Sequence, residues 1–248
     1  MPARTTTSPT NPPPAPTYSL CPYQGPPAPA ALHIAPWTDE HPVDVPVYLN
    51  QDLALTYGEA ERPEDRDDDG VLLQRWGGTA TGGINWGAHQ THRQTYAVDH
   101  LKCAACVQDP DVQRPGHARD PDVREVHGML WILPSLGRGE DDMWPRDLET
   151  TVPPMCRMHA HRAIRDCPEL REGYVALRVR ESERIGYIGT VYTPTNPPRP
   201  QGQRIVRFTE PAIHRVVARQ LVRKLYQAEP DSSLGRTATP ACDTAPRC

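Results

Sequence analysis

Four side chains in this sequence have the chemical types and the spacing of a zinc site. Cys103 and Cys106 form a Cys-x-x-Cys pair, and Cys156 and His159 form a second pair with the same spacing. Zinc prefers thiolate sulfur and imidazole nitrogen, and its structural sites take four such ligands in a tetrahedron. We therefore predict that these side chains bind one Zn²⁺. Because the protein fills every ligand position, the metal is expected to stabilise the fold rather than to do chemistry.

The second pair of ligands is expected at the start of a helix. Two prolines precede Cys156, and apolar or small residues then recur with helical spacing as far as Pro168. This pattern predicts a helix over residues 155–167. Positions three apart share one face of a helix, so Cys156 and His159 point the same way, whereas His161 does not.

The sequence around the first pair offers an alternative fourth ligand and departs from the usual zinc-knuckle pattern. His100, three residues before Cys103, is an alternative to His159 as the fourth ligand. Zinc knuckles also commonly carry glycine after the second cysteine, and Val107 stands there instead. Two matching pairs still favour a metal site over reduced core thiols beside a surface histidine.

Two other motifs are incomplete. Residues 65–70 read Asp-x-Asp-x-Asp-Gly, the first half of a calcium loop, but Trp76 stands where the closing glutamate is needed. Asp99-His100 imitates the start of a His-Asn-His nuclease motif, but the next asparagine is Asn196, too far away to share its helix. The sequence therefore leans away from an enzyme, and a divergent metal-dependent nuclease is kept as the alternative.

The remaining apolar patterns predict the elements that must position the zinc site. Alternation indicates a hairpin at residues 175–193 and strands at 43–47, 71–73, 128–133 and 204–208. A second helix is expected from Pro211, with one apolar face formed by Ile213, Val216, Val217, Leu221 and Leu225. The expected fold is α+β, a small antiparallel sheet with two main helices around a treble-clef-like zinc site.

Composition divides the sequence into four parts. Residues 1–36, rich in Pro and Thr, and residues 229–248 lack a periodic apolar face, so both are predicted to be disordered tails. Residues 37–170 are predicted to form the zinc-binding α+β core. Residues 171–228 are predicted to form a basic module, a hairpin of strands plus an amphipathic helix, that packs on this core.

Charge and hydropathy constrain the partners. The formal net charge is −4, but residues 171–228 are net positive. Five arginines of this module predict a surface for DNA or RNA phosphates: Arg178, Arg180, Arg215, Arg219 and Arg223. Interspersed Glu181, Glu183 and Glu210 favour the alternative of a solvated charged face. No apolar run approaches the about 18 residues of a membrane span, so a cytoplasmic protein without a membrane partner is expected.

Several runs of this sequence carry a resemblance to a known group of proteins. They include the Cys103–Cys106 pair, Gly128-Met-Leu-Trp-Ile-Leu, Pro153-Pro-Met-Cys-Arg-Met-His and Arg171-Glu-Gly-Tyr-Val-Ala-Leu-Arg-Val-Arg. With them, roughly residues 34–228 resemble uncharacterised proteins of Streptomyces and related actinobacteria. That group carries Cys-x-x-Cys in both places, so the resemblance implies that His159 replaces a cysteine ligand. It implies a metal and a source but no activity.

These patterns together predict a zinc-stabilised intracellular binding protein whose partner is nucleic acid or another protein. The divergent nuclease is one alternative. A structural or assembly protein of a mobile element or phage is another, and only the long proline-rich N-terminal stretch indicates it.

Overall fold

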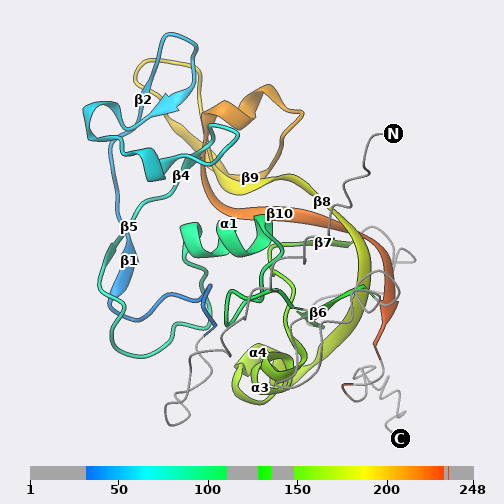
Figure 1. Cartoon of the computed structure of the whole chain (residues 1–248). Helices are drawn as coiled ribbons and strands as arrows, with labels where there is room; N and C mark the ends of the chain where they lie inside the picture. Colours follow the sequence, from blue (N-terminus) through cyan, green and yellow to red (C-terminus); the bar gives the residue numbers. More distant parts are fainter. Residues whose placement is uncertain (1–31, 111–127, 136–147, 232–233, 235–248) are drawn as a thin grey trace, which may run out of the picture.

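A curved antiparallel ribbon of two long strands, β8 (Tyr174–Tyr192) and β10 (Val216–Pro230), is the main element of the fold (Figure 1). The computed structural model describes residues 32–110, 128–135, 148–231 and 234. The two strands pair from Val216 opposite Val191 to Pro230 opposite Leu177. β-Branched residues recur in both strands and favour an extended backbone.

Four shorter strands complete the sheet. β6 (Met129–Pro134) pairs with the first part of β8, and β9 (Pro200–Arg207) pairs with its last part. On the other side of the ribbon, β4 (Leu72–Leu73) and β7 (Leu148–Thr150) pair with β10. All these pairs are antiparallel except β4 with β10, which is parallel. The predicted combination of helices with a sheet is confirmed, and the parallel pair departs from the predicted antiparallel sheet.

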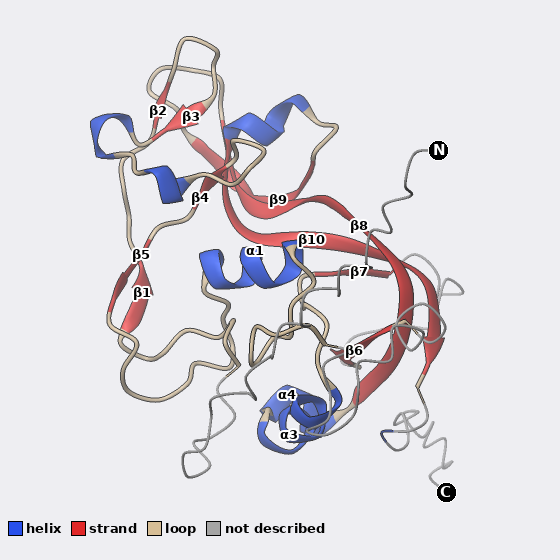
Figure 2. Cartoon of the chain, in the orientation of Figure 1, coloured by secondary structure: helices blue, strands red, loops and turns tan. Residues whose placement is uncertain are grey.

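The helices lie on the inner side of the curved ribbon. α1 (Thr91–Asp99) lies along β10, while α3 (Arg157–Asp166) and α4 (Pro168–Glu172) lie near β6 at one end (Figure 2). No helix in the described part of the chain is long and apolar enough to cross a membrane. The remaining short elements are β1 (Glu40–Pro42), β2 (Tyr48–Leu49), β3 (Leu55–Thr56), η1 (Gly58–Ala60), η2 (Pro63–Asp65), β5 (Trp76–Gly78) and η3 (Pro211–Arg215).

The helix predicted from Pro211 is wrong, because only the short turn η3 precedes the strand β10. β10 contains two register shifts, one between Ala218 and Gln220 and one between Val222 and Arg223. Each shift changes the phase of the side-chain alternation along the strand. Residues 216–218 and 221–223 are therefore buried as groups of three. This grouping imitates the spacing of an amphipathic helix.

The hairpin predicted at residues 175–193 is also wrong, because β8 runs through it without a turn. The polar residues between its apolar halves pair with β10, for example Ser182 opposite Leu225. Gly189 permits the close approach of the two strands, since a Cβ atom there would lie 2.4 Å from the carbonyl oxygen of Val217. The ribbon is therefore continuous from one end of the molecule to the other.

The shorter predicted elements are mostly confirmed. α3, β4, β6 and β9 lie where a helix and three strands are expected, and α3 ends just before Pro168. Residues 43–47 form no strand, so the edge strand predicted there is wrong. The sheet also joins the two predicted structured parts of the chain, because β6 and β8 come from opposite sides of the boundary at residue 170.

A buried glutamine side chain forms hydrogen bonds with the edge of β10 where neither β4 nor β7 pairs with it. β4 pairs with β10 as far as Ala218 and β7 pairs with it from Arg223, which leaves the outer side of Leu221 between them. Gln94 of α1 occupies this gap. Its Oε1 accepts from the Leu221 N–H, and its Nε2 donates to the Leu221 carbonyl, both at 2.9 Å. Nε2 also donates to the carbonyl of Thr151 at 2.6 Å, so one side chain fastens α1 to the sheet.

Described structure extends beyond both predicted tail boundaries. Ile34 is 1% exposed and packs in the same core cluster as Leu234. At the C-terminal end, Pro230 still belongs to β10, and Asp231 pairs with Arg178 at 2.7 Å. The rest of the predicted tails, residues 1–31, 232–233 and 235–248, lies outside the described residues.

We expect Gln94→Leu to lower the free energy of unfolding by about 3 kcal/mol, because the Leu221 peptide groups and the Thr151 carbonyl would be buried without partners. Denaturant unfolding of the full chain, followed by tryptophan fluorescence, measures this change. Gln108→Leu is the control, since Gln108 is exposed, and it should change the value by less than about 0.5 kcal/mol. Equal effects of the two substitutions would contradict the bridging role.

Candidate metal centre

The first two cysteines lie in a tight turn that follows α1. The backbone N–H of Cys103 donates to the carbonyl of Gln108 at 2.9 Å, and the N–H of Val107 donates to the carbonyl of Cys103 at 3.0 Å. Cys103 is buried and Cys106 is half-buried. A closed Cys-x-x-Cys turn of this kind is the knuckle from which many structural zinc sites take two ligands.

The residue after the second cysteine has an unusual backbone conformation. Val107 has φ of +60°, in the left-handed region that glycine adopts freely and a β-branched residue adopts rarely. The turn therefore has the conformation for which knuckles carry glycine, although the sequence supplies valine. A residue held there stores on the order of 1–3 kcal/mol of strain.

The other two predicted ligands stand on the first turn of α3. Cys156 is the N-cap residue of this helix, and His159 lies three residues further on. The segment before the helix is fixed from two sides. Its Pro154 carbonyl accepts from the Ala104 N–H at 3.0 Å, and its Met155 N–H donates to the Leu130 carbonyl at 2.8 Å. These two bonds place the start of α3 between the knuckle and β6.

The four predicted ligand atoms lie within 4.8 Å of one another. Cys103 Sγ is 3.7 Å from Cys156 Sγ and 3.6 Å from His159 Nδ1, and Cys156 Sγ is 2.8 Å from His159 Nδ1. In a zinc tetrahedron with ordinary bond lengths, ligand atoms lie about 3.5–3.8 Å apart. Two of these separations match those of such a tetrahedron, and the separation of Cys156 Sγ from His159 Nδ1 is shorter.

The thiols and the imidazole of the cluster are coupled by hydrogen bonds. Hydrogen bonds from the thiols of Cys106 and Cys156 lower the pKa of Cys103, which favours its thiolate form. The backbone N–H of Cys156 also donates to the Cys103 sulfur at 3.4 Å. Hydrogen bonding, chiefly to Cys103, raises the pKa of Cys156 and raises the pKa of His159 to about 10. A metal ligand must be a thiolate or a neutral imidazole, so metal binding would release protons from these two residues.

The structure brings His159, and not His100, into the cluster. His100 is exposed at the end of α1, where its ring stacks on Tyr96 and its Nδ1 lies 3.1 Å from the Tyr96 carbonyl. His161 is exposed on another face of α3, as its position two residues after His159 predicts. Cys167 is buried at the opposite end of α3 and is not part of the cluster.

The carboxylates of the incomplete calcium loop do not converge on a common point. Each is bound by a different group of the protein. Asp65 pairs with Arg75, Asp67 accepts from the hydroxyl of Tyr187 at 2.6 Å, and Asp69 pairs with Arg184 at 3.0 Å. The acidic stretch therefore fastens the loop before β4 to its neighbours.

One predicted nucleic-acid ligand is part of the core. Arg223 is 8% exposed, and burial lowers the pKa of its guanidinium. Its Nη1 donates to the carbonyls of Val98 and Asp99 at 3.1 and 3.3 Å, and its Nε and Nη2 donate to Ser182. Cations near the C-terminus of a helix are stabilising. Arg223 therefore joins the end of α1 to β8.

The other four predicted arginines are not equivalent. Arg178 and Arg180 form ion pairs with carboxylates near the end of β10, at 2.7 and 3.5 Å. Arg215 and Arg219, at the start of β10, each have a buried Nε without a hydrogen-bond partner among the described residues. The structure thus separates the five arginines into a buried one, a paired set and a set with an unused donor.

Ile34, which no sequence pattern predicted to be buried, packs beneath the Cys/His cluster. Ile34 packs in the same cluster as Cys103 and Cys156, and its N–H donates to the carbonyl of Ala104 at 3.3 Å. No local pattern marks Ile34, because it follows a proline-rich stretch without apolar periodicity. Its burial depends on a contact with a turn far along the chain.

Comparison of the chain with protein-family models, with curated proteins and with solved structures gives no match. The resemblance to the actinobacterial group therefore stays a prediction. Function has to be inferred from the geometry and chemistry of the site.

Val107→Gly is expected to raise the free energy of unfolding by about 1 kcal/mol. Relief of about 1–3 kcal/mol of strain should exceed the up to about 1 kcal/mol that glycine costs through a more flexible unfolded chain. Thermal melting of the purified protein measures the change. Ala105→Gly is the control in the same turn, and it should lower stability because φ is not positive at Ala105. A lower melting temperature for Val107→Gly would show that the turn does not require glycine geometry.

Proposed function

We propose that the protein is a zinc-stabilised cytoplasmic binding protein in which Cys103, Cys106, Cys156 and His159 hold one structural Zn²⁺. The observation that carries this proposal is the gathering of three sulfurs and one imidazole nitrogen within 4.8 Å. This ligand set favours zinc over calcium or magnesium, which take oxygen ligands. Two ligands from a turn and two from the start of a helix also support the treble-clef-like description.

The surroundings of the site explain why a metal would be needed. The core cluster around it contains many small side chains, among them Ala97, Ala104, Ala160, Ala163 and Ala176. Hydrophobic stabilisation follows the apolar area that is buried, and alanine buries little. The binding free energy of a structural zinc ion becomes folding free energy. Zinc would therefore supply stability that apolar burial does not provide in this part of the molecule.

The same ligand set supports a structural role over catalysis. Catalytic zinc sites keep a position for water or substrate, whereas four protein ligands fill the tetrahedron. The residues that imitate a nuclease motif lie outside this centre. The Asp99 carboxylate pairs with Arg184 at 3.1 Å, and His100 stacks on Tyr96. The nuclease alternative thus gains no support from their positions.

If these four residues bind zinc, replacing one of the cysteines should lower both the zinc content and the melting temperature. Cys103→Ser and Cys156→Ser should reduce bound zinc from about one ion per chain to near zero. Loss of 3–5 kcal/mol of metal-linked stability would lower the melting temperature by about 10 °C in a protein of this size. Metal analysis by inductively coupled plasma mass spectrometry and melting with and without a strong chelator measure the two effects.

Matched variants separate ligation from packing. Cys167→Ala removes a buried cysteine outside the cluster, and His161→Ala removes an exposed histidine of the same helix, so both should keep zinc. His159→Cys should also keep zinc, because thiolate can replace imidazole as a ligand, whereas His159→Ala should lose it. Absence of zinc from the purified wild type, with melting unchanged by chelator, would overturn the proposal.

Nucleic acid is the partner that one observation favours. The buried Nε of Arg215 has no hydrogen-bond partner in the described ranges of the chain, and Arg215 and Arg204 line a hollow of about 330 Å³ next to β9 and η3. Guanidinium groups are strong donors to phosphate oxygens. Arg204 also pairs with Glu210 at 2.8 Å, which orients its side chain at the edge of this hollow. The proposed contact with nucleic acid therefore lies at one end of the ribbon and does not include the whole basic module, residues 171–228.

A gel-shift titration with double-stranded DNA, single-stranded DNA and RNA tests this partner. We expect binding that weakens steeply with salt, and a several-fold loss of affinity for Arg215→Gln. Arg171→Gln is the control, since Arg171 is exposed on α4 at the other end of the sheet. Cleavage in the presence of Mg²⁺ would support the nuclease alternative. No binding at low salt would exclude nucleic acid and favour a protein partner or an assembly role.

A further inference from the structure

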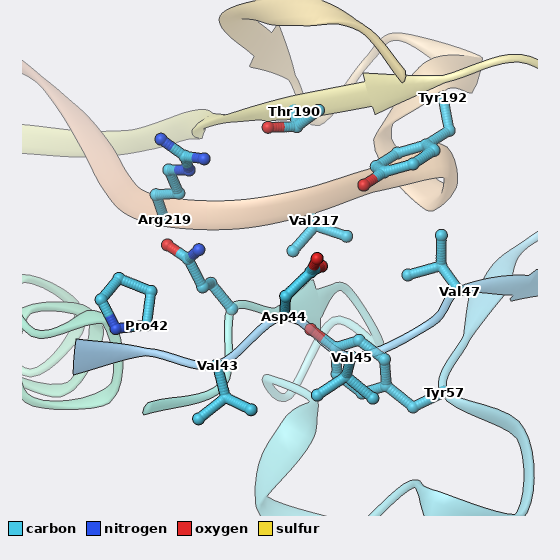
Figure 3. Close-up of a pocket in the computed structure, with 11 residues that line it drawn as sticks. Pro42, Val43, Asp44, Val45, Val47, Tyr57, Thr190, Tyr192, Val217 and Arg219 are labelled. Atoms are coloured by element: carbon cyan, nitrogen blue, oxygen red, sulfur yellow. The ribbon is translucent and has the colours of Figure 1, made fainter. Parts of the chain in front are cut away.

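A second hollow lies at the end of the sheet opposite α3 and α4, with a volume of about 270 Å³ (Figure 3). One wall is the segment between β1 and β2, and the other is formed by the last part of β8 and the first part of β10. Among the residues that line it are Asp44, Val47, Thr190, Tyr192, Val217 and Arg219. The volume is just below the range of about 300–1,000 Å³ usual for ligand pockets, which fits a small ligand.

The two walls carry opposite charges. Figure 3 shows the carboxylate of Asp44 directed toward the ribbon, where Thr190, Tyr192 and Arg219 stand. Valine side chains, including Val47 and Val217, surround these polar groups. The accessible lining of the hollow is more polar than apolar, and polar groups that converge on one space fix the orientation of a small ligand.

Neither charge is neutralised by an ion pair within the described part of the chain. Asp44 has no salt bridge there, and Arg219 makes one side-chain hydrogen bond, from Nη1 to Gln203 Oε1 at 2.9 Å. The Nε of Arg219 is buried and has no partner among the described residues. A buried donor without a partner is a cost to folding, and a ligand that accepts from Arg219 would relieve it. Asp44 is exposed, so its carboxylate is hydrated in the free protein.

Tyr192 lines the same hollow as both charged residues. Burial raises the pKa of its hydroxyl, the carboxylate of Asp44 raises it further, and the guanidinium of Arg219 opposes this effect. The hydroxyl therefore stays protonated at neutral pH and can donate or accept a hydrogen bond. Thr190 adds a second hydroxyl on the same wall.

We propose that this hollow binds a small zwitterion, a molecule with a carboxylate and an ammonium group joined to an apolar body, of the size of a free amino acid. Arg219 and Thr190 would take the carboxylate, because a guanidinium binds carboxylate oxygens with well-defined geometry. Asp44 would take the ammonium group. Val47, Val217 and the ring of Tyr192 would cover the apolar body. This inference goes beyond the proposed structural metal and does not depend on it.

Nuclear magnetic resonance of the isotopically labelled full chain tests the proposal. Each of the twenty standard L-amino acids is titrated separately, and amide shifts are followed at residues 42–47, 190–192 and 217–219. At least one amino acid should give saturable shifts there. Its N-acetyl derivative, which lacks the ammonium group, and its amide, which lacks the carboxylate, should each bind at least tenfold more weakly. No saturable shift with any amino acid, or equal binding of the three forms, would overturn the proposal.

Paired variants assign the two charges. Arg219→Gln and Asp44→Asn should each weaken binding of the same amino acid at least tenfold, and Asp44→Asn should remove the preference over the N-acetyl form. Arg171→Gln and Asp52→Asn are exposed controls away from the hollow and should bind as the wild type does. Melting curves establish that each variant is folded. Unchanged binding in both Arg219→Gln and Asp44→Asn would place the ligand elsewhere. The metal content of these variants, measured in parallel, tests the zinc proposal separately.

Discussion

The antiparallel pairing of β8 with β10 is the interaction on which the rest of the described structure depends. β6 and β9 pair with β8, and β4 and β7 pair with β10. Gln94 ties α1 to the stretch of β10 that these shorter strands leave uncovered. Register shifts such as those in β10 bend a strand and increase its twist. The register shifts therefore help to curve the ribbon around the helices. They also break the regular alternation of buried and exposed residues by which a strand is recognised in a sequence.

The cluster of Cys103, Cys106, Cys156 and His159 lies where parts of the chain meet that the ribbon does not reach by strand pairing. The knuckle at Cys103 meets the segment before α3 through one backbone bond, from Ala104 to Pro154. The core beneath it is rich in alanine, so apolar burial there is modest. A four-ligand metal would then be the strongest interaction at this end. The left-handed conformation of Val107 fits this view, because strained residues persist where their surroundings over-determine the geometry.

The ligand cluster could be predicted from sequence because its signals are local. Each pair spans four residues, and the helix that carries Cys156 and His159 has a regular apolar period. β10 could not be predicted in the same way, because its phase depends on pairing with residues of β8 that lie far away in the sequence. The burial of Arg223 likewise depends on α1, whose carbonyls it binds. α1 itself lacks a clear apolar stripe, since its central buried contact is the polar Gln94.

The two candidate sites, the Cys/His cluster and the hollow lined by Asp44 and Arg219, lie at opposite ends of the ribbon and suggest different roles for the two ends. At one end, a metal would make the geometry rigid, and every ligand atom has a partner within the cluster. At the other end, Asp44 and Arg219 line one hollow without forming an ion pair among the described residues. The exposed carboxylate of Asp44 is hydrated, whereas the buried Nε of Arg219 has no partner in the described ranges, which is unfavourable in the free protein. A ligand that accepts from Arg219 would relieve that cost on binding, so this end of the ribbon is the better placed for recognition.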